Sequence, residues 1–274
     1  MNRVSVPTGR PFASMEKVAD LLVELGSERV LPRFRSLRQG DVHEKGPGDL
    51  VTVVDHEVEE ELTRRLPELV PGSRVVGEEG VSRDASLLAG MGQGWVWVVD
   101  PLDGTVNFVE GRPDFALMVG LLKDGEPVAA WIHSPPTASI AAAQSGAGAT
   151  LNGEQLRLEP GMACEPRGIA MTKYLPPDVR AVWERSSNGT GFGQGTGSAA
   201  IDYLALARGQ WDFLFYWRTH PWDHVPGSLF VQEAGGHVAR PDGTACRVGD
   251  GRSGLLVAES AAAWRSARRL LPRP

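Results

Sequence analysis

Acidic side chains recur in this sequence at the ends of predicted strands and the starts of predicted helices, where local structure would leave them accessible. The five are Asp55, Glu78, Asp100, Asp103 and Asp223. Asp100 and Asp103 lie in the run DPLDGT, where a proline fixes φ and a glycine permits unusual backbone angles, so a sharp turn can bring both carboxylates together. Two close carboxylates resist joint ionisation unless a cation lies between them. Carboxylate oxygens suit Mg²⁺, which also binds substrate phosphate.

The two residues after Asp103 could hold an anion. If Thr105 opens a helical turn, backbone N–H groups there face outward and bind an anion, and the Thr105 hydroxyl can orient a water molecule. A cation, a phosphate cradle and this hydroxyl would then converge, which describes metal-assisted hydrolysis of a phosphate ester. A single aspartate before proline is more often a turn former, and one at a helix start is more often only a cap. The whole pattern, with GEE upstream and WD downstream, is much less expected by chance.

Composition restricts the classes of function. The chain has 274 residues, with 28 Lys and Arg against 34 Asp and Glu, and the formal net charge of −6 argues weakly against a nucleic-acid partner. No apolar run approaches the roughly 18–20 residues needed to cross a bilayer, so no membrane partner is expected. Residues 1–17 hold no apolar segment after their basic residues and are unlike a secretory signal. We therefore expect a globular, cytoplasmic protein that is long enough to bury a sizeable core.

Residue periodicity predicts the elements that would position these groups. Apolar residues at helical spacing indicate an amphipathic helix from residue 13 to about residue 38. A β-rich run at residues 49–54 leads into Asp55, at a plausible N-cap position, and a helix follows that ends near Pro67. Further strands are predicted at residues 73–76, 95–99, 115–122, 128–133, 138–144 and 149–158.

The second half of the chain alternates helices with short strands. The predicted helices are at residues 178–185, 198–208, 223–234 and 261–271, and the strands at residues 168–171, 213–216, 238–239 and 254–258. Asp223 would cap the third of these helices. Helices that alternate with sheets indicate a layered α/β or α+β protein. We expect two halves, residues 1–140 with most of the candidate metal ligands and residues 141–274 with Asp223 and the segment that determines specificity.

Several motifs together resemble those of the inositol monophosphatase family of Mg²⁺-dependent, lithium-sensitive phosphatases. The matching segments are DLVTVVD at 49–55, GEE at 77–79, DPLDGTVNF at 100–108, GAGATLNG at 146–153, GSAA at 197–200, WD at 222–223 and EAGG at 233–236. They follow the family's order and spacing from about residue 13 to 271, and DPLDGT is highly specific. The resemblance implies an α+β fold, a layered αβαβα sandwich of the inositol monophosphatase and fructose bisphosphatase type, commonly a homodimer.

The resemblance also implies a set of metal ligands. Glu78, Asp100 and the backbone carbonyl of Leu102 would bind a first Mg²⁺. Asp100, Asp103 and Asp223 would bind a second, and Glu78 could touch a third, so two to three ions are expected. Metal ions roughly 4 Å apart would then clamp an in-line displacement at phosphorus.

Two further roles follow from the same resemblance. Thr105, with Asp55 as its hydrogen-bond partner, would position and activate the attacking water. The backbone amides of Gly104 and Thr105 would hold the phosphate group. The reaction would pass through no covalent intermediate on the protein.

Two positions depart from the family members that act on inositol phosphate. Those members carry a glutamate about seven residues before the aspartate of WD, where this chain has Tyr216, and an arginine three residues before the glycine of GSA, where it has Gln194. Their loss removes charge-assisted hydrogen bonds to a polyol, so myo-inositol 1-phosphate is expected to be a poor substrate. Arg218 could meet a second anionic group or stay solvated. The residues predicted to contact the substrate are Gln194, Gly197, Ser198, Tyr216 and Arg218.

The predicted function is a Mg²⁺-dependent phosphomonoesterase for a small phosphorylated metabolite, such as a sugar, cyclitol, inositol or histidinol phosphate. One alternative is the 3′(2′),5′-bisphosphate nucleotidase or fructose-1,6-bisphosphatase activity of relatives. Another is a regulatory or binding protein of the same shape with little turnover. The complete set of acidic ligands speaks against the latter, because binding alone does not require every ligand.

Overall fold

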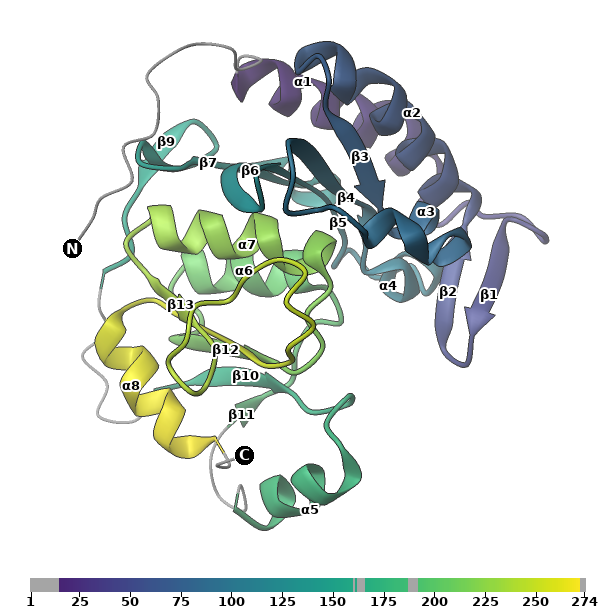
Figure 1. The fold of residues 1–274 in the computed structure, drawn as a ribbon. Helices are drawn as coiled ribbons and strands as arrows, with labels where there is room; N and C mark the ends of the chain where they lie inside the picture. The colour runs from purple at the N-terminus through teal and green to yellow at the C-terminus, as the bar shows by residue number, and fades with distance from the viewer. Residues whose placement is uncertain (1–14, 160, 162–165, 187–191, 272–274) are drawn as a thin grey trace.

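Two β-sheets and the helices that cover them form five layers in the computed structural model (Figure 1), which describes residues 15–159, 161, 166–186 and 192–271. The larger sheet has seven strands in sequence order: β3 (Arg74–Gly77), β4 (Trp95–Asp103), β5 (Ala116–Lys123), β6 (Glu126–Ser134), β7 (Ser139–Gln144), β8 (Gly148–Leu151) and β9 (Glu154–Leu156). Strand β3 runs parallel to β4, and every later pair is antiparallel.

The smaller sheet lies in the second half of the chain. Its order is β11 (Phe192–Gly193), β10 (Gly168–Met171), β12 (Phe213–Tyr216), β14 (Leu255–Ala258) and β13 (His237–Ala239). A separate two-stranded hairpin, β1 (Val42–Gly46) with β2 (Asp49–Thr52), projects from the side of the molecule in Figure 1.

Helices fill the other three layers. The longer ones are α1 (Met15–Leu25), α2 (Val53–Leu69), α5 (Pro177–Ser186), α6 (Ala199–Ala207), α7 (Pro221–Glu233) and α8 (Ala261–Leu270), and the shorter ones are α3 (Glu78–Arg83) and α4 (Thr105–Val109). Helices α1 and α2 contact one face of the larger sheet, α6 and α7 lie between the two sheets, and α8 contacts the outer face of the smaller sheet. The predicted αβαβα sandwich is confirmed.

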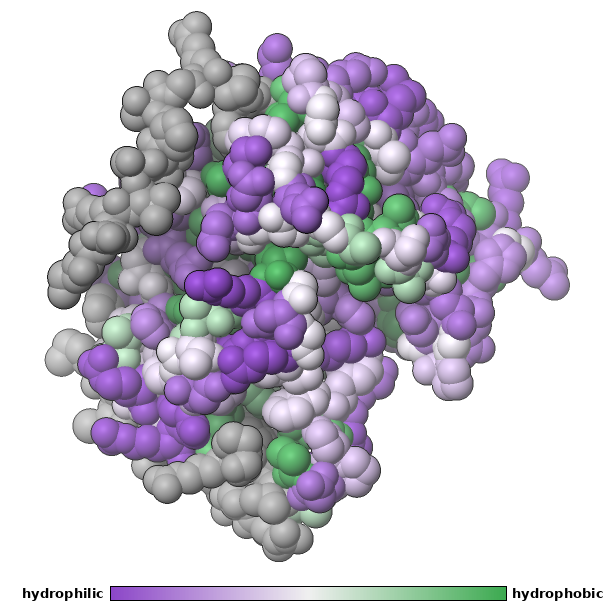
Figure 2. Space-filling view, viewed as in Figure 1, coloured by the Kyte–Doolittle hydropathy of each residue, from purple (hydrophilic) through white to green (hydrophobic). Residues whose placement is uncertain are grey.

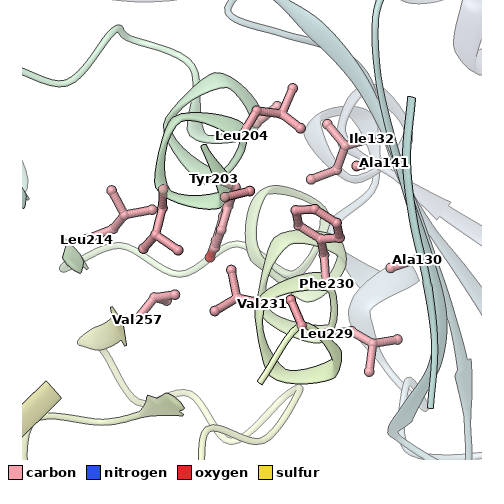
Figure 3. Close-up of a cluster of buried hydrophobic side chains, with 14 of the residues drawn as sticks. Ala130, Ile132, Ala141, Tyr203, Leu204, Leu214, Leu229, Phe230, Val231 and Val257 are labelled. Carbon is pink, nitrogen blue, oxygen red and sulfur yellow. The ribbon is translucent and has the colours of Figure 1, made fainter. Parts of the chain in front are cut away.

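The middle layer is held by apolar side chains from both sheets. In Figure 3, Tyr203 and Leu204 of α6 and Phe230 of α7 lie between Ile132 of the larger sheet and Leu214 of the smaller one. All five are buried. Since each sheet has helices on both faces, its central strands are apolar almost throughout, as in the run WVWVV of β4.

Apolar residues at the surface are scattered. Figure 2 shows one face on which hydrophilic and intermediate residues predominate and hydrophobic ones form small separate patches. None of the described helices is long and apolar enough to span a membrane.

Several predicted boundaries were wrong, for local reasons. The first helix is regular only to Leu25 and continues as a π-turn (Gly26–Val30) and a 3₁₀ turn (Leu31–Arg33), because Pro32 cannot donate an α-helical hydrogen bond. Residues 13 and 14 lie outside the described residues. Strand β4 does not stop at residue 99 but continues irregularly to Asp103.

Asp55 and Asp223 were both predicted to be helix N-caps, and neither of them is one. Helix α2 begins at Val53 with Thr52 as its N-cap, and it runs through Pro67 to Leu69. Asp55 is the third residue of α2, where its side chain accepts a hydrogen bond from the Thr52 N–H in a capping box. Asp223 is likewise in the first turn of α7, whose N-cap is His220.

The predicted boundary between residues 140 and 141 falls inside β7, so it divides the larger sheet. The chain leaves that sheet after Leu156 and enters the smaller one at Gly168. The division of the chain into two functional halves stays a prediction.

Candidate metal centre

Three of the predicted ligands converge at the carboxyl ends of β3 and β4 in the larger sheet. Strands β3 and β4 are parallel and Gly77 pairs with Val99, so the next residue of each, Glu78 and Asp100, emerges at the same end. Helix α7 contacts β4, and its first turn brings Asp223 to this edge. Carboxylate oxygens of Glu78, Asp100 and Asp223 all lie within 4.8 Å of one another.

The electrostatics of these carboxylates favour a bound cation. Asp100 is only 2% exposed, and its pKa lies well above the usual value because of burial and the negative charges of Glu78, Asp103 and Asp223. Burial and the neighbouring charges also raise the pKa of Asp223. A divalent cation would remove this repulsion, and hard oxygen donors are those that Mg²⁺ prefers.

A lysine from the hairpin balances part of this charge. Lys45 of β1 donates hydrogen bonds to Glu78 Oε1 and Glu79 Oε1, each at 2.8 Å. Burial disfavours the Lys45 ammonium, but the two glutamates outweigh that cost and the pKa of Lys45 is raised. Lys45 was not predicted as a residue of the site, because only the tertiary fold brings β1 against α3.

Asp103 lies beside this group with one oxygen committed to α6. Its Oδ2 accepts hydrogen bonds from Ser198 Oγ at 2.5 Å and from the Ala200 N–H at 2.7 Å. Burial raises the pKa of Asp103, and the hydrogen bond from Ser198 opposes that rise. Ser198 caps α6 and donates to Asp103, and its predicted contact with substrate stays a prediction.

The predicted partnership of Thr105 and Asp55 is present in the geometry. Thr105 Oγ1 lies 3.0 Å from Asp55 Oδ1 and 2.9 Å from the carbonyl oxygen of Leu102, and its single proton can go to either acceptor. Asp55 Oδ2 accepts hydrogen bonds from the N–H and the hydroxyl of Thr52. Burial raises the pKa of Asp55 to about 7, although the hydrogen bonds from Thr52 oppose the rise.

The turn between β4 and α4 requires glycine at position 104. Gly104 has φ of +91°, and a Cβ there would lie 2.6 Å from the carbonyl oxygen of Asp114. The same turn is tied to the second half of the chain by Asn107, whose Nδ2 donates to the carbonyl oxygens of Asp114 and Thr196.

These groups line a cleft with a volume of about 510 Å³. The cleft contains Glu78, Asp100, Leu102, Asp103, Gly104, Thr105, Gly197, Arg218 and Asp223 among its lining residues. A side chamber of about 130 Å³ adjoins it next to Asp103 and Asp223, and Gly197, Ser198, Tyr216 and Arg218 line that chamber. Gln194 is exposed and lines neither space.

The Tyr216 hydroxyl has a partner within the protein, and its predicted contact with substrate stays a prediction. The hydroxyl donates to Asp202 Oδ2 at 3.4 Å, and the other oxygen of Asp202 accepts from the N–H and hydroxyl of Thr196. Burial raises the pKa of Asp202 to about 6. Asp202 lines the side chamber and was missed, although one acid in the otherwise apolar helix AAIDYLALA was a signal.

Comparisons with known proteins agree with this geometry. The model of the family described as "Inositol monophosphatase family" matches residues 13–272. The chain is 31% identical over 190 residues to a "Fructose-1,6-bisphosphatase/inositol-1-monophosphatase" of Thermotoga maritima, covering 69% of this chain and 71% of that protein. It is 34% identical over 218 residues to a "Nus factor SuhB" of Pseudomonas aeruginosa, covering 75% and 79%. The solved structure of the "extragenic suppressor protein suhB" of Bartonella henselae matches with a TM-score of 0.80 and 25% identity, over 94% of this chain and 98% of that one.

Proposed function

The chain belongs to the inositol monophosphatase family, and we propose on that basis that it hydrolyses a phosphate monoester of a small polar metabolite with the help of Mg²⁺. The observation that carries the proposal is that carboxylate oxygens of Glu78, Asp100 and Asp223 lie within 4.8 Å of one another. Thr105 lines the same cleft, and the buried Asp55 lies 3.0 Å behind its hydroxyl. This is the arrangement that metal-assisted attack of water on phosphorus requires.

The donor set fits Mg²⁺. Glu78, Asp100 and the Leu102 carbonyl would hold one ion, and Asp100, Asp103 and Asp223 a second. When bound, Mg²⁺ supplies positive charge that stabilises the phosphoryl oxygens and the leaving oxygen. Two to three ions are consistent with this number of carboxylates.

The protein's own part is to position the water and the phosphate. If Thr105 donates its proton to Asp55, its oxygen is left with lone pairs that can accept a hydrogen bond from the attacking water. Asp55 is in turn held by Thr52, so the direction of the Thr105 hydroxyl is fixed by α2. The backbone amides of Gly104 and Thr105 would hold the phosphate at the start of α4.

Inositol is not the substrate that this cleft favours. Tyr216 gives its hydroxyl to Asp202, and Gln194 lies outside the cleft, so neither supplies the carboxylate or guanidinium that would hold a polyol. We expect kcat/KM for myo-inositol 1-phosphate below about 10⁴ M⁻¹s⁻¹, the low end of ordinary enzyme efficiency.

The test is release of inorganic phosphate from a panel of phosphorylated metabolites, with Mg²⁺ and with EDTA. The panel contains myo-inositol 1-phosphate, histidinol phosphate, fructose 1,6-bisphosphate, 3′-phosphoadenosine 5′-phosphate and several sugar phosphates. Mg²⁺-dependent turnover of any of them supports the proposal and ranks the substrate classes. A folded protein that binds Mg²⁺ and turns over none of them, nor a general aryl phosphate, would overturn it.

A regulatory function is the second candidate, because one relative is named a Nus factor. The net charge of −6 disfavours direct binding to RNA. Silence across the panel would favour this candidate. The homodimer and the cytoplasmic location stay predictions.

A further inference from the structure

The side chamber next to the candidate metal centre is built mainly from residues that the family motifs do not explain. Its lining residues outside those motifs include Tyr174, Asp202, Tyr216, Trp217, Arg218 and His224. Because the chamber adjoins Asp103 and Asp223, it is where the non-transferred part of a phosphate ester would lie if the proposed function holds.

Two cations lie around one aromatic ring beside this chamber: Arg218 lines both the chamber and the cleft, and Lys173 lines the cleft. The Arg218 guanidinium carbon lies 4.0 Å from the centroid of the Tyr174 ring, and Lys173 Nζ lies 5.3 Å from the same centroid. In the part of the chain that the structure describes, no carboxylate oxygen lies within 4.0 Å of either cation. A guanidinium stacked on a ring keeps its N–H edges free for a planar, bidentate anion.

A buried histidine, His224, forms a hydrogen bond with the backbone of Arg218. His224 Nε2 lies 3.1 Å from the Arg218 carbonyl oxygen, which can only accept, so Nε2 is the donor. His224 Nδ1 then accepts from the Tyr203 hydroxyl at 3.2 Å. Figure 3 shows Tyr203 packed among apolar side chains between α6 and α7. This packing holds the partner of His224 in the core.

Asp202 is the carboxylate of the chamber that is no proposed metal ligand. It is 1% exposed, and both of its oxygens accept hydrogen bonds from Thr196 and Tyr216, so they are already occupied by protein donors. The position that would carry a glutamate in members acting on inositol phosphate is Tyr216, so that negative charge is absent here.

We propose that Arg218, assisted by Lys173, binds a second anionic group, a phosphate or a carboxylate, on the leaving part of the substrate. The proposal rests on the proposed phosphatase function. In the reaction, water attacks phosphorus and the bond from phosphorus to the ester oxygen breaks. That oxygen takes a proton, and the products are inorganic phosphate and an alcohol that still carries the second anion. His224 acts as a positioning residue, because it reaches the substrate only through Arg218.

The test compares substrates that differ only in the second anion. Fructose 1-phosphate is paired with fructose 1,6-bisphosphate for a phosphate, and glycerol 1-phosphate with 3-phosphoglycerate for a carboxylate. The variants are Arg218→Gln and, as a control, Arg112→Gln, which removes a charge from the same cleft where it is already paired with Glu110 at 2.6 Å. The preference of the wild type within a pair, measured as kcat/KM, identifies which anion is bound.

We expect the wild type to prefer the two-anion member of at least one pair by tenfold or more. Arg218→Gln should reduce kcat/KM for that member about 10- to 100-fold, the effect of losing a charge-assisted hydrogen bond, and change the one-anion member less than about twofold. His224→Phe should raise KM for the two-anion member with kcat largely kept. Arg112→Gln should change neither member selectively.

Two results would overturn the proposal. One is a wild type that shows no preference for the second anion in either pair; the other is an equal loss for both members in Arg218→Gln. Thermal stabilisation by the same four compounds with Mg²⁺ gives a readout without turnover. Absence of hydrolysis across the wider panel above, with an aryl phosphate included, overturns the phosphatase function, whereas equal stabilisation by one-anion and two-anion compounds overturns the role of Arg218.

Discussion

Asp100 sets stability against function. It is buried among Glu78, Asp103 and Asp223, whose charges raise its pKa well above the usual value, so its ionised form needs a nearby cation. Asp100→Asn should therefore lower kcat by at least about 10³-fold, because a ligand shared by both proposed ions is lost. The same variant should be as stable as the wild type, or more stable, in EDTA.

Phosphate release and urea unfolding in EDTA measure the two halves of this prediction. Asp20→Asn, an exposed acid in α1, is the matched control and should leave both unchanged. Near-normal turnover by purified Asp100→Asn would show that the metal assignment is wrong.

Asp202 should make the stability of the metal-free protein depend on pH. Burial raises its pKa to about 6 from a model-compound value of 3.8. Between these values the folded carboxyl keeps a proton that the unfolded chain has lost, so stability falls as the pH rises through this window. The fall attributable to Asp202 is up to about 3 kcal/mol. Asp202→Asn stays neutral and keeps an acceptor for Thr196.

Urea unfolding in EDTA from about pH 4 to pH 7 should show the free energy of unfolding of Asp202→Asn rising relative to wild type as the pH increases. The difference should level off above the folded pKa. Parallel curves for the two proteins would mean that Asp202 ionises normally in the fold.

Residue motifs predicted which acids meet at the candidate metal centre better than they predicted its surroundings. Asp100, Thr105 and Asp223 follow from short local patterns, because each lies at or next to a turn or a helix start. Lys45 could not be assigned in this way, since its partners Glu78 and Glu79 lie on an element that is distant in sequence. Its role exists only after the hairpin has packed.

The contact between α6 and α7 depends on one glycine. A Cβ at Gly227 of α7 would lie 2.2 Å from two carbons of the Tyr203 ring in α6. Gly227→Ala should reduce the free energy of unfolding by about 1–3 kcal/mol, because a well-packed core cannot absorb the extra methyl group. Gly92→Ala, where a Cβ would meet nothing within 4 Å, should change it by less than about 0.5 kcal/mol.

Urea unfolding of both variants measures this difference. If Gly227→Ala matched Gly92→Ala in stability, the two helices would pack more loosely than described.

The types of the longer elements were predictable, whereas their ends, the strand β1 and the division of residues 149–158 into β8 and β9 were not. The strand and helix patterns of β5, β6 and α6 are long apolar runs or clear periodic stretches, so sequence periodicity finds them. The end of α1 is set by a π-turn, and the end of β4 by an irregular pairing between Asp100 and Asp103 with β5. Such features depend on partners across the fold, which periodicity does not contain.

At the scale of the whole molecule, the candidate metal centre joins two layers. Asp100 lies in β4 of the larger sheet and Glu78 directly follows β3, whereas Asp223 belongs to the middle helical layer. Mg²⁺ at roughly ten times its Kd should therefore stabilise the folded protein by about 1.4 kcal/mol. Hydrogen exchange should slow about tenfold at residues 100–105 and 221–224, and EDTA should reverse the change.

A Mg²⁺ effect spread evenly over the protein, or none at these segments, would contradict a site between the layers. Residues far from the centre, such as those of α8, serve as the internal control.

The order of the layers could not be worked out from the residues alone. Periodicity predicted alternating helices and sheets, and the αβαβα order came only with the family resemblance. In the smaller sheet, β12 pairs with β10 and with β14, which is reached about 40 residues later in the chain. Pairings at that separation leave no local trace in sequence.

The sequential order of the larger sheet also determines when the centre can be completed during synthesis. Strands β4 to β9 each pair with the next strand along the chain, so they can assemble once Leu156 has been made. The face of the sheet that α7 will cover stays exposed until residues 199–233 have been made. Covering that face is thus the step that delivers Asp223, so the three carboxylates of the candidate metal centre meet only after α7 has packed, while β13, β14 and α8 are made later still.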